Sequence, residues 1–190
     1  MIDNPTLEAI RQRRSVHQFL SEPVSDEQLE AILEAGRWAP STLNSQPWDF
    51  VVVTDPQTRC QIGTILEQIT LSWKGFAAAP AMIVVAVSPR GDPGHFVEDG
   101  AIAAQNICLA AQSIGLASSW AGVYGKKAVD KALKKLLALP LTHRVIAVIP
   151  VGTAERVGRR SRRPLAEMVH RDRFHPMPAA DSYVSTMDPL

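Results

Sequence analysis

The run from Met82 to Val87 limits what this chain can fold into more than any other part of the sequence. All six of its residues are apolar and most are β-branched, and it lies between Pro80 and a turn-forming segment at 89–94. A continuous apolar run of this length is typical of a strand that is buried on both faces. We therefore predict that Met82–Val87 forms an internal strand of a sheet.

Helical and extended patterns alternate along the remaining chain. Apolar residues at helical spacing, preceded by capping residues, predict helices. The predicted helices run from Pro5 to about Arg13, from after Ser25 to about Arg37, from Pro56 to Ile69, from Phe96 to Ile114 and from Lys127 to Ala138. The other extended segments are 49–54, 118–123 and 145–151. The helix 96–114 is apolar nearly all round, which predicts that it is buried, in the core or at an interface. This order predicts an α+β fold in one domain, residues 1–190.

The composition is that of a globular chain without a membrane span. Apolar residues make up 46% and charged residues 21% of the sequence, and no apolar stretch reaches the roughly 20 residues that a membrane helix needs. The N-terminus lacks the apolar core of a signal peptide, so the cytoplasm is the expected compartment. The two cysteines, Cys60 and Cys108, lie among apolar residues and are predicted to be buried free thiols.

Several common functional classes lack their motifs in this chain. No GxGxxG follows a strand, and neither GxxxxGK[ST] nor GxSxG occurs, which argues against a Rossmann dinucleotide site, a P-loop and a hydrolase nucleophile elbow. The histidines of 170–175 lack zinc-site spacing, so no metal is predicted. A net charge of +1 argues against a nucleic-acid partner. Arginines nevertheless gather at both ends of the chain, which predicts an anionic ligand: Arg11, Arg13, Arg14, Arg156, Arg159, Arg160, Arg162 and Arg163.

Two polar segments are candidates for ligand binding. Guanidinium, hydroxyl and imidazole groups stand together in 13–17, where a helix gives way to extended chain, and such donors suit a phosphate. A solvated basic helix end has the same composition. The loop 39–48 is crowded with hydroxyl and amide groups, but a plain turn uses the same residues. Composition alone leaves both alternatives open for each segment.

The order of four segments resembles the nitroreductase family. The segments are RRSVHQF at 13–19, APSTLNSQPWDFVVV at 39–53, GLASSWAGV at 115–123 and RSRRPLAEMVH at 160–170. The string PSxxNxQPW is the most specific part of a resemblance that spans nearly the whole chain. It implies a central, mostly antiparallel sheet flanked by helices, and an interlocked homodimer whose tails, from about residue 152, wrap the partner. Two FMN molecules would lie at the dimer interface.

The resemblance also implies which residues contact FMN. The ribityl phosphate and pyrimidine edge would be held from 13–17 and from the tail, the partner subunit would contribute the loop, and a backbone stretch would face the flavin N5 edge. The contacts to the phosphate and pyrimidine edge would be Arg13, Arg14, Ser15 and His17, with Arg160 and Arg162 from the tail. The partner's loop would contribute Pro40, Ser41, Thr42 and Asn44. The stretch that faces N5 would be Gly122 and Val123. Glycine in such a stretch allows close approach of the backbone to a ligand.

His17 departs from the family pattern, in which this position is usually Lys or Arg. Histidine titrates near neutral pH. We therefore expect that flavin affinity or reduction potential depends on pH through His17. The basic residue that the family carries before the strand at Ala81 is not clearly aligned; Lys74 is a candidate outside the predicted site.

The resemblance implies a ping-pong cycle, in which NADH or NADPH reduces FMN and a small electron-poor acceptor, a nitroaromatic or quinone, reoxidises it. No side chain is predicted to act as a catalytic acid or base, because flavin carries the redox chemistry. Trp73, Phe76 and Tyr124 are candidates to line the acceptor pocket, with core or dimer packing as the alternative. Other flavin chemistry on the same fold, such as dehydrogenation, dehalogenation or flavin fragmentation, is the alternative activity. A flavin-binding protein without turnover is a further alternative.

Overall fold

The computed structural model describes residues 2–88, 94–158 and 160–175, and the chain divides into two compact units, Met1–Gly158 and Arg159–Leu190. All described strands and α-helices belong to the first unit. The second unit contains the short 3-10 turn η3 (Leu165–Glu167). Arg159 and the tail from 176 onward lie outside the described residues, so the predictions made for them are not addressed by the structure.

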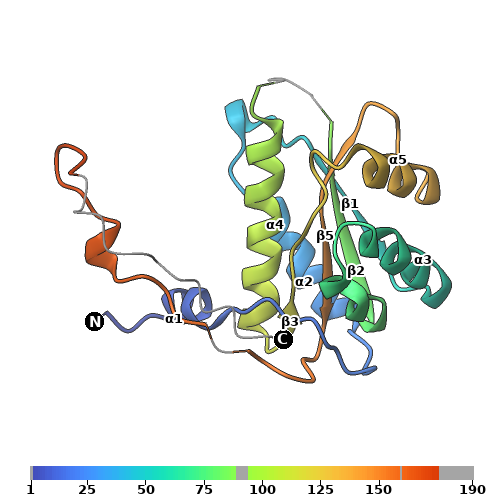
Figure 1. Ribbon diagram of the computed structural model, residues 1–190, viewed down its shortest axis with the longest axis horizontal. Helices are drawn as coiled ribbons and strands as arrows, with labels where there is room; N and C mark the ends of the chain where they lie inside the picture. The colour runs from blue at the N-terminus through green and yellow to red at the C-terminus, as the bar shows by residue number, and fades with distance from the viewer. Residues whose placement is uncertain (1, 89–93, 159, 176–190) are drawn as a thin grey trace. The chain divides into compact units, whose positions relative to one another are not determined.

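The sheet of the first unit is built around β2 (Ala81–Val87) and β5 (Arg144–Gly152), which pair antiparallel (Figure 1). β1 (Trp48–Val53) pairs antiparallel with the other side of β2. Two short strands, β3 (Ala117–Ser118) and β4 (Ala121–Gly122), both pair antiparallel with β5. The strand order is β1-β2-β5-β3, with β4 beside β5. This arrangement confirms the predicted α+β class with a mostly antiparallel sheet.

β2 is the internal strand that its sequence predicts. It lies between β1 and β5 in the sheet, and every one of its seven residues is buried. Its alternate residues serve two separate cores, because successive side chains of a strand point to opposite faces. Ile83 and Val85 pack in one core, and Met82 and Val84 pack in the other.

The helices α1, α2 and α3 begin where their capping residues predict. The Asn4 side chain accepts hydrogen bonds from the first turn of α1, and Ser25 with Gln28 forms the reciprocal capping box of α2. The bounds are α1 (Pro5–Gln12), α2 (Asp26–Arg37), α3 (Pro56–Glu67), α4 (Phe96–Ser113) and α5 (Lys127–Leu136). Gly115, with φ of 82°, follows the end of α4, as a helix stop requires.

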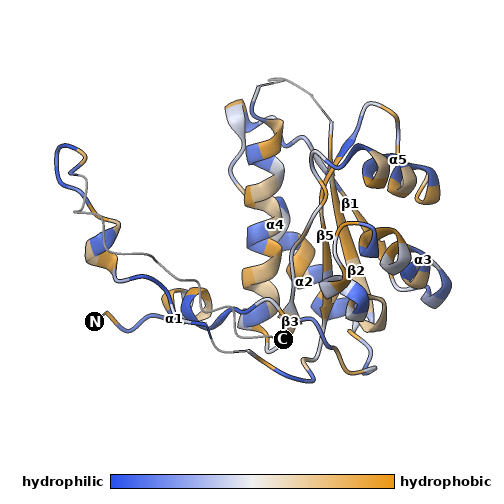
Figure 2. Ribbon diagram, viewed as in Figure 1, coloured by the Kyte–Doolittle hydropathy of each residue, from blue (hydrophilic) through white to orange (hydrophobic). Residues whose placement is uncertain are grey.

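Helices cover both faces of the sheet. α2 and α4 pack on one face around Ile32 and Ile107, whereas α3, α5 and the 3-10 segment η2 (Leu71–Ala78) pack on the other. Figure 2 shows the three long strands as predominantly apolar and the outer helix faces as mixed. Among the described residues, no helix combines the length and the apolarity needed to cross a bilayer.

Three features differ from the sequence-based expectations. The segment 118–123 is not one extended piece but divides into β3 and β4, and the 3-10 segment η2 was not predicted at all. Cys108 is buried as predicted, but the prediction for Cys60 is wrong, because its side chain lies on the exposed face of α3. Within this chain the helix α4 buries one face, and Ile102 on its other side is 39% exposed, so burial of that side at an interface stays a prediction.

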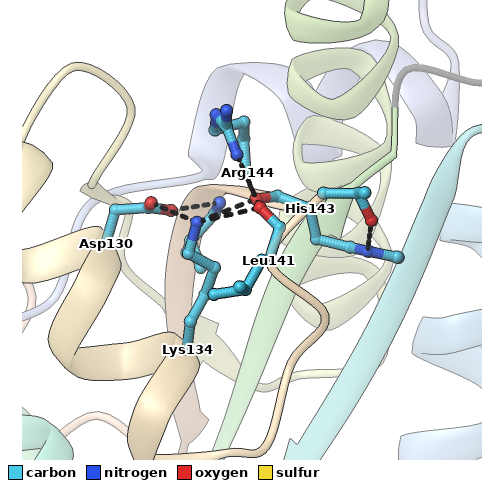
Figure 3. Close-up of polar contacts among 7 residues, drawn as sticks. Asp130, Lys134, Leu141, His143 and Arg144 are labelled. Carbon is cyan, nitrogen blue, oxygen red and sulfur yellow. Dashed lines mark hydrogen bonds and ion pairs between the residues drawn. The ribbon is translucent and has the colours of Figure 1, made fainter.

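The corner between α5 and β5 is closed by a network of polar contacts, which we call the corner network (Figure 3). Asp130 accepts the backbone N–H of Val145 at 2.9 Å and forms an ion pair with Lys134 at 2.8 Å. Lys134 donates in turn to the carbonyl of His143, and Nε2 of His143 lies 2.7 Å from the carboxylate of Asp49 on β1. The side chains of Lys134 and Asp130 are only 10% and 16% exposed, so the ion pair is largely buried.

Candidate flavin site

The segment 13–17 leaves the end of α1 and runs beside β3. The backbone N–H of Val16 donates to the carbonyl of Ser118 at 3.1 Å, and Ser15 forms a parallel bridge with Ser118. Val16 itself is buried. The strand-like pairing therefore fixes the backbone of this segment, while Ser15 stays exposed at its surface.

The two arginines of this segment have different surroundings. The guanidinium of Arg14 donates to the carbonyls of Arg11 and Arg13 and so caps the end of α1. Arg13 has no hydrogen bond from its side chain within the described part of the chain. Burial raises the pKa of the Cys108 thiol, and the positive charge of Arg13 opposes this rise. Both arginines are half-buried, but only Arg14 has a structural role, whereas the Arg13 guanidinium donates to no described residue.

His17 is held by η2. Its Nδ1 lies 3.0 Å from the carbonyl of Ser72, and its ring stacks on Phe76 with a centroid distance of 5.4 Å. Since a carbonyl can only accept, Nδ1 must carry the hydrogen. Nε2 can then donate to a ligand only when the ring is the doubly protonated imidazolium. A side chain at Gly75 would collide with the carbonyl oxygen of His17, which shows how closely η2 lies against this segment.

The candidate acceptor-pocket residues have different environments. Phe76 is fully buried, so it packs in the core and does not line an acceptor pocket. Trp73 is half-buried and stacks on Phe76 at 5.9 Å. Tyr124 is 50% exposed and touches Phe96 edge-on. Tyr124 is the most exposed of these three side chains.

The β4 backbone lies open at Gly122. Val123 is buried, and its N–H donates to the carbonyl of Ile146 at 2.9 Å, which fixes the end of β4 against β5. A Cβ added at Gly122 would meet nothing closer than the indole of Trp120 at 3.7 Å. The packing of this chain therefore does not require glycine at 122, and the space above the backbone is open to a ligand.

The loop 40–46 has an unusual backbone. It contains the 3-10 turn η1 (Thr42–Asn44), and three of its residues have positive φ: Leu43 at 52°, Asn44 at 57° and Gln46 at 47°. The hydroxyl of Ser41 accepts the N–H of Gln46 at 2.9 Å. Within the described residues, the exposed Asn44 side chain has no hydrogen-bond partner.

Sequence reasoning missed Asp99, the residue that holds this loop. Asp99 lies in the first turn of α4, is 3% exposed and accepts the N–H of Thr42 at 3.0 Å. A signal was present in the sequence, since an acidic residue in a largely apolar helix requires a polar partner when it is buried. The partner stands 57 positions away, so the pattern alone could not identify it.

The roles of the remaining predicted contact residues in binding FMN stay predictions. Pro40 is exposed, and Ser41 and Thr42 are half-buried. Arg160 and Arg162 are exposed residues of the second unit, and their place beside the phosphate stays a prediction. Among the described residues, no three His, Cys, Asp or Glu side chains gather as a metal site would require.

The donors found here fit FMN. Arg13 offers a cation that is unpaired among the described residues and suits a phosphate. Ser15 offers an exposed hydroxyl, and Gly122 an open backbone edge that a planar ring can approach. The pairing of 13–17 with β3 brings the first two groups to the strand region that continues into Gly122.

The model of the nitroreductase family matches residues 10–72 and 66–153 of this chain. The chain belongs to the nitroreductase family, whose named members are enzymes. An Archaeoglobus fulgidus protein named as an NADH dehydrogenase/NAD(P)H nitroreductase is 37% identical over 77% of this chain and 83% of its own length. A Methanothermobacter thermautotrophicus protein of the same name is 33% identical over 89% of this chain and 85% of its own. A 5,6-dimethylbenzimidazole synthase of Rhodospirillum rubrum is 28% identical over 80% and 87%.

Solved structures agree with this assignment. An NADH dehydrogenase/NAD(P)H nitroreductase of Parabacteroides distasonis superposes with a TM-score of 0.82 at 28% identity, covering 90% of this chain and 100% of that one. An FMN-dependent nitroreductase of Clostridium difficile superposes with a TM-score of 0.80 at 26% identity, covering 88% and 99%. The predicted family is thus confirmed both by sequence and by fold.

Proposed function

We propose that this chain is an FMN-dependent oxidoreductase that passes hydride from NADH or NADPH to an electron-poor acceptor, a nitroaromatic or quinone, by a ping-pong mechanism. The observation that carries the proposal is the pair of Arg13, whose side chain has no hydrogen bond within the described residues, and the exposed hydroxyl of Ser15, in a segment that pairs with β3 next to the open backbone of Gly122. The similarity to a nitroreductase described as FMN-dependent supports it.

FMN, when bound, would supply the two-electron redox chemistry, accepting hydride from the nicotinamide and releasing it to the acceptor. Arg13 and Ser15 would hold the phosphate end, and the family resemblance implies that Arg160 and Arg162 of the tail would join them. His17 would donate from Nε2 to the pyrimidine edge in its imidazolium form. Gly122 and Val123 would provide the backbone that faces the ring. No side chain needs to act as an acid or base, because solvent supplies the remaining proton.

The active form is a homodimer in this proposal. The apolar residues of α1 are uncovered in the single chain, with Ile10 50% exposed, and Leu43 in the loop is 90% exposed. Exposed apolar surface of this kind is typical of an interface. A second copy would cover these side chains, and its loop 40–46, with Asn44, would reach the FMN of the first. The tail from about residue 152 would wrap the partner.

An anaerobic absorbance titration tests this function. The purified protein should show flavin bands that bleach on addition of NADH or NADPH and return on addition of menadione or a nitroaromatic. Flavin that neither nicotinamide reduces would refute the reductase activity. A protein that takes up no FMN would refute the site.

Other flavin chemistry on this fold is the second candidate, because one similar protein is named a 5,6-dimethylbenzimidazole synthase. The two candidates differ in the fate of the cofactor. Mass spectrometry of the flavin recovered after many turnovers with a quinone should find intact FMN if the protein is a reductase. Loss of FMN in proportion to turnover would favour fragmentation instead.

A further inference from the structure

Asp99 is a buried carboxylate whose oxygens face the loop 40–46. One oxygen accepts both the N–H of Thr42 at 3.0 Å and the Thr42 hydroxyl at 3.4 Å, and the other lies 3.5 Å from the hydroxyl of Ser45. Among the described residues no cation pairs with this carboxylate. Its position in the first turn of α4 stabilises the charge, since the helix N-terminus carries partial positive charge.

The loop needs an external restraint to keep its conformation. Leu43, Asn44 and Gln46 all have positive φ, which residues with side chains rarely adopt and which persists only where surrounding contacts impose it. The other hydrogen bonds of 41–46 join residues of the loop to one another. Within the described part of the chain, every hydrogen bond from 41–46 to another segment ends on Asp99.

We infer that Asp99 is a positioning residue that tethers the loop and thereby sets how Asn44 meets the FMN of the partner subunit. This inference rests on the proposed function. It also assigns different roles to the predicted contact residues Thr42 and Asn44, because Asp99 already accepts hydrogen bonds from both the N–H and the hydroxyl of Thr42. Thr42 is then an anchor of the loop, and the unpaired Asn44 is the group presented to the ligand.

The chain offers a matched control for this tether. Asp55 also accepts the N–H and the hydroxyl of one threonine, Thr58, but it does so at the start of α3, outside the predicted site. Asp99→Ala, Asp99→Asn, Asp55→Ala and Asp55→Asn are compared in the full-length chain. Two quantities are measured: thermolysin cleavage before Leu43 in the FMN-free protein, followed by mass spectrometry, and the FMN dissociation constant from the quenching of flavin fluorescence.

We expect Asp99→Ala to speed cleavage before Leu43 and to raise the FMN dissociation constant about tenfold, which corresponds to about 1.4 kcal/mol. Asp99→Asn keeps one acceptor for the N–H of Thr42, so it should raise the constant only about threefold and restore most of the resistance to cleavage. If Asp99→Ala does not fold, Asp99→Asn decides by the same comparison. The Asp55 variants should change neither quantity.

Three results separate the possibilities. Unchanged cleavage in both Asp99 variants would overturn the tether. Faster cleavage with an unchanged FMN dissociation constant would overturn its link to the cofactor. A wild-type chain that binds no FMN would overturn the proposed function, whereas the cleavage comparison would still decide whether Asp99 holds the loop.

Discussion

At the corner network, Asp130, Lys134 and His143 meet partners from the same chain, and the ion pair is largely buried. At the end of α1, by contrast, Arg13 is half-buried without a hydrogen bond in the described chain, and Ser15 is exposed. Both regions concentrate charge beside β5 or its neighbours. One region uses its polar groups to hold strand and helix together, and the other leaves them available. Unused donors, rather than charge itself, are therefore what marks the candidate site.

The largest effect should come from breaking the corner network. Asp130→Ala removes the partner of a buried lysine and the acceptor of the Val145 N–H, so the free energy of unfolding should fall by about 3–5 kcal/mol. Urea denaturation of the FMN-free protein measures this change. FMN affinity of the folded fraction should stay the same. A loss of affinity without a loss of stability would show that the two regions are not separate in function.

The opposite pattern is expected at Arg13. Arg13→Ala removes a cation with no partner in the described chain, so stability should change by less than about 0.5 kcal/mol. FMN affinity should fall by roughly 10–100-fold, as expected for a charge-assisted contact to phosphate. Arg14→Ala is the matched variant, because Arg14 caps α1 and should lose less affinity. Fluorescence titration at low and high salt measures the FMN affinity of both variants. Equal losses for the two arginines would contradict the distinction drawn between them.

Gly122→Ala tests whether the open backbone of β4 is the ligand edge. The fold accommodates the new methyl group, since its nearest neighbour would be the Trp120 ring at 3.7 Å. The melting temperature of the FMN-free protein should therefore hold, while FMN affinity falls about tenfold through overlap with the ring. Gly158→Ala is the control, because nothing lies within 4 Å of a Cβ there. Full FMN affinity in Gly122→Ala would remove Gly122 from the site.

The smallest effect should be a pH dependence at His17. Because Nδ1 is engaged by Ser72, Nε2 donates only in the imidazolium form. A rise in pH disfavours the doubly protonated form of any histidine, so FMN affinity should be several-fold higher in acid than in alkali. His17→Arg should flatten this profile between pH 5 and 8, measured by fluorescence titration. Identical profiles for the two proteins would exclude His17 as the source.

Local signals in the sequence were sufficient for most elements of the fold. The capping box at Ser25 fixes the start of α2, and the apolar run at 82–87 identifies the buried strand, because each depends on adjacent residues. η2 escaped prediction because a 3-10 segment with a central glycine has no helical periodicity. Cys60 was misplaced because composition does not tell which face of a helix a residue occupies.

The candidate site was only partly accessible from the sequence. The family resemblance named Arg13 and Arg14 together, and nothing in the chain order distinguishes the unpaired guanidinium from the one that caps its helix. Asp99 needed the fold, since helix packing brings it to Thr42 across a long sequence separation. Contacts that arise from tertiary packing carry no local signature.

The contrast between the two thiols makes this chain easy to tag chemically. Cys108 is buried and the pKa of its thiol is raised, so little thiolate forms and reagents do not reach it, whereas Cys60 is exposed on α3. A maleimide dye added near neutral pH should therefore attach at a single position of the unmodified wild-type sequence. Fluorescence from that dye would report on assembly of two copies, through energy transfer between differently labelled chains, without any engineered cysteine.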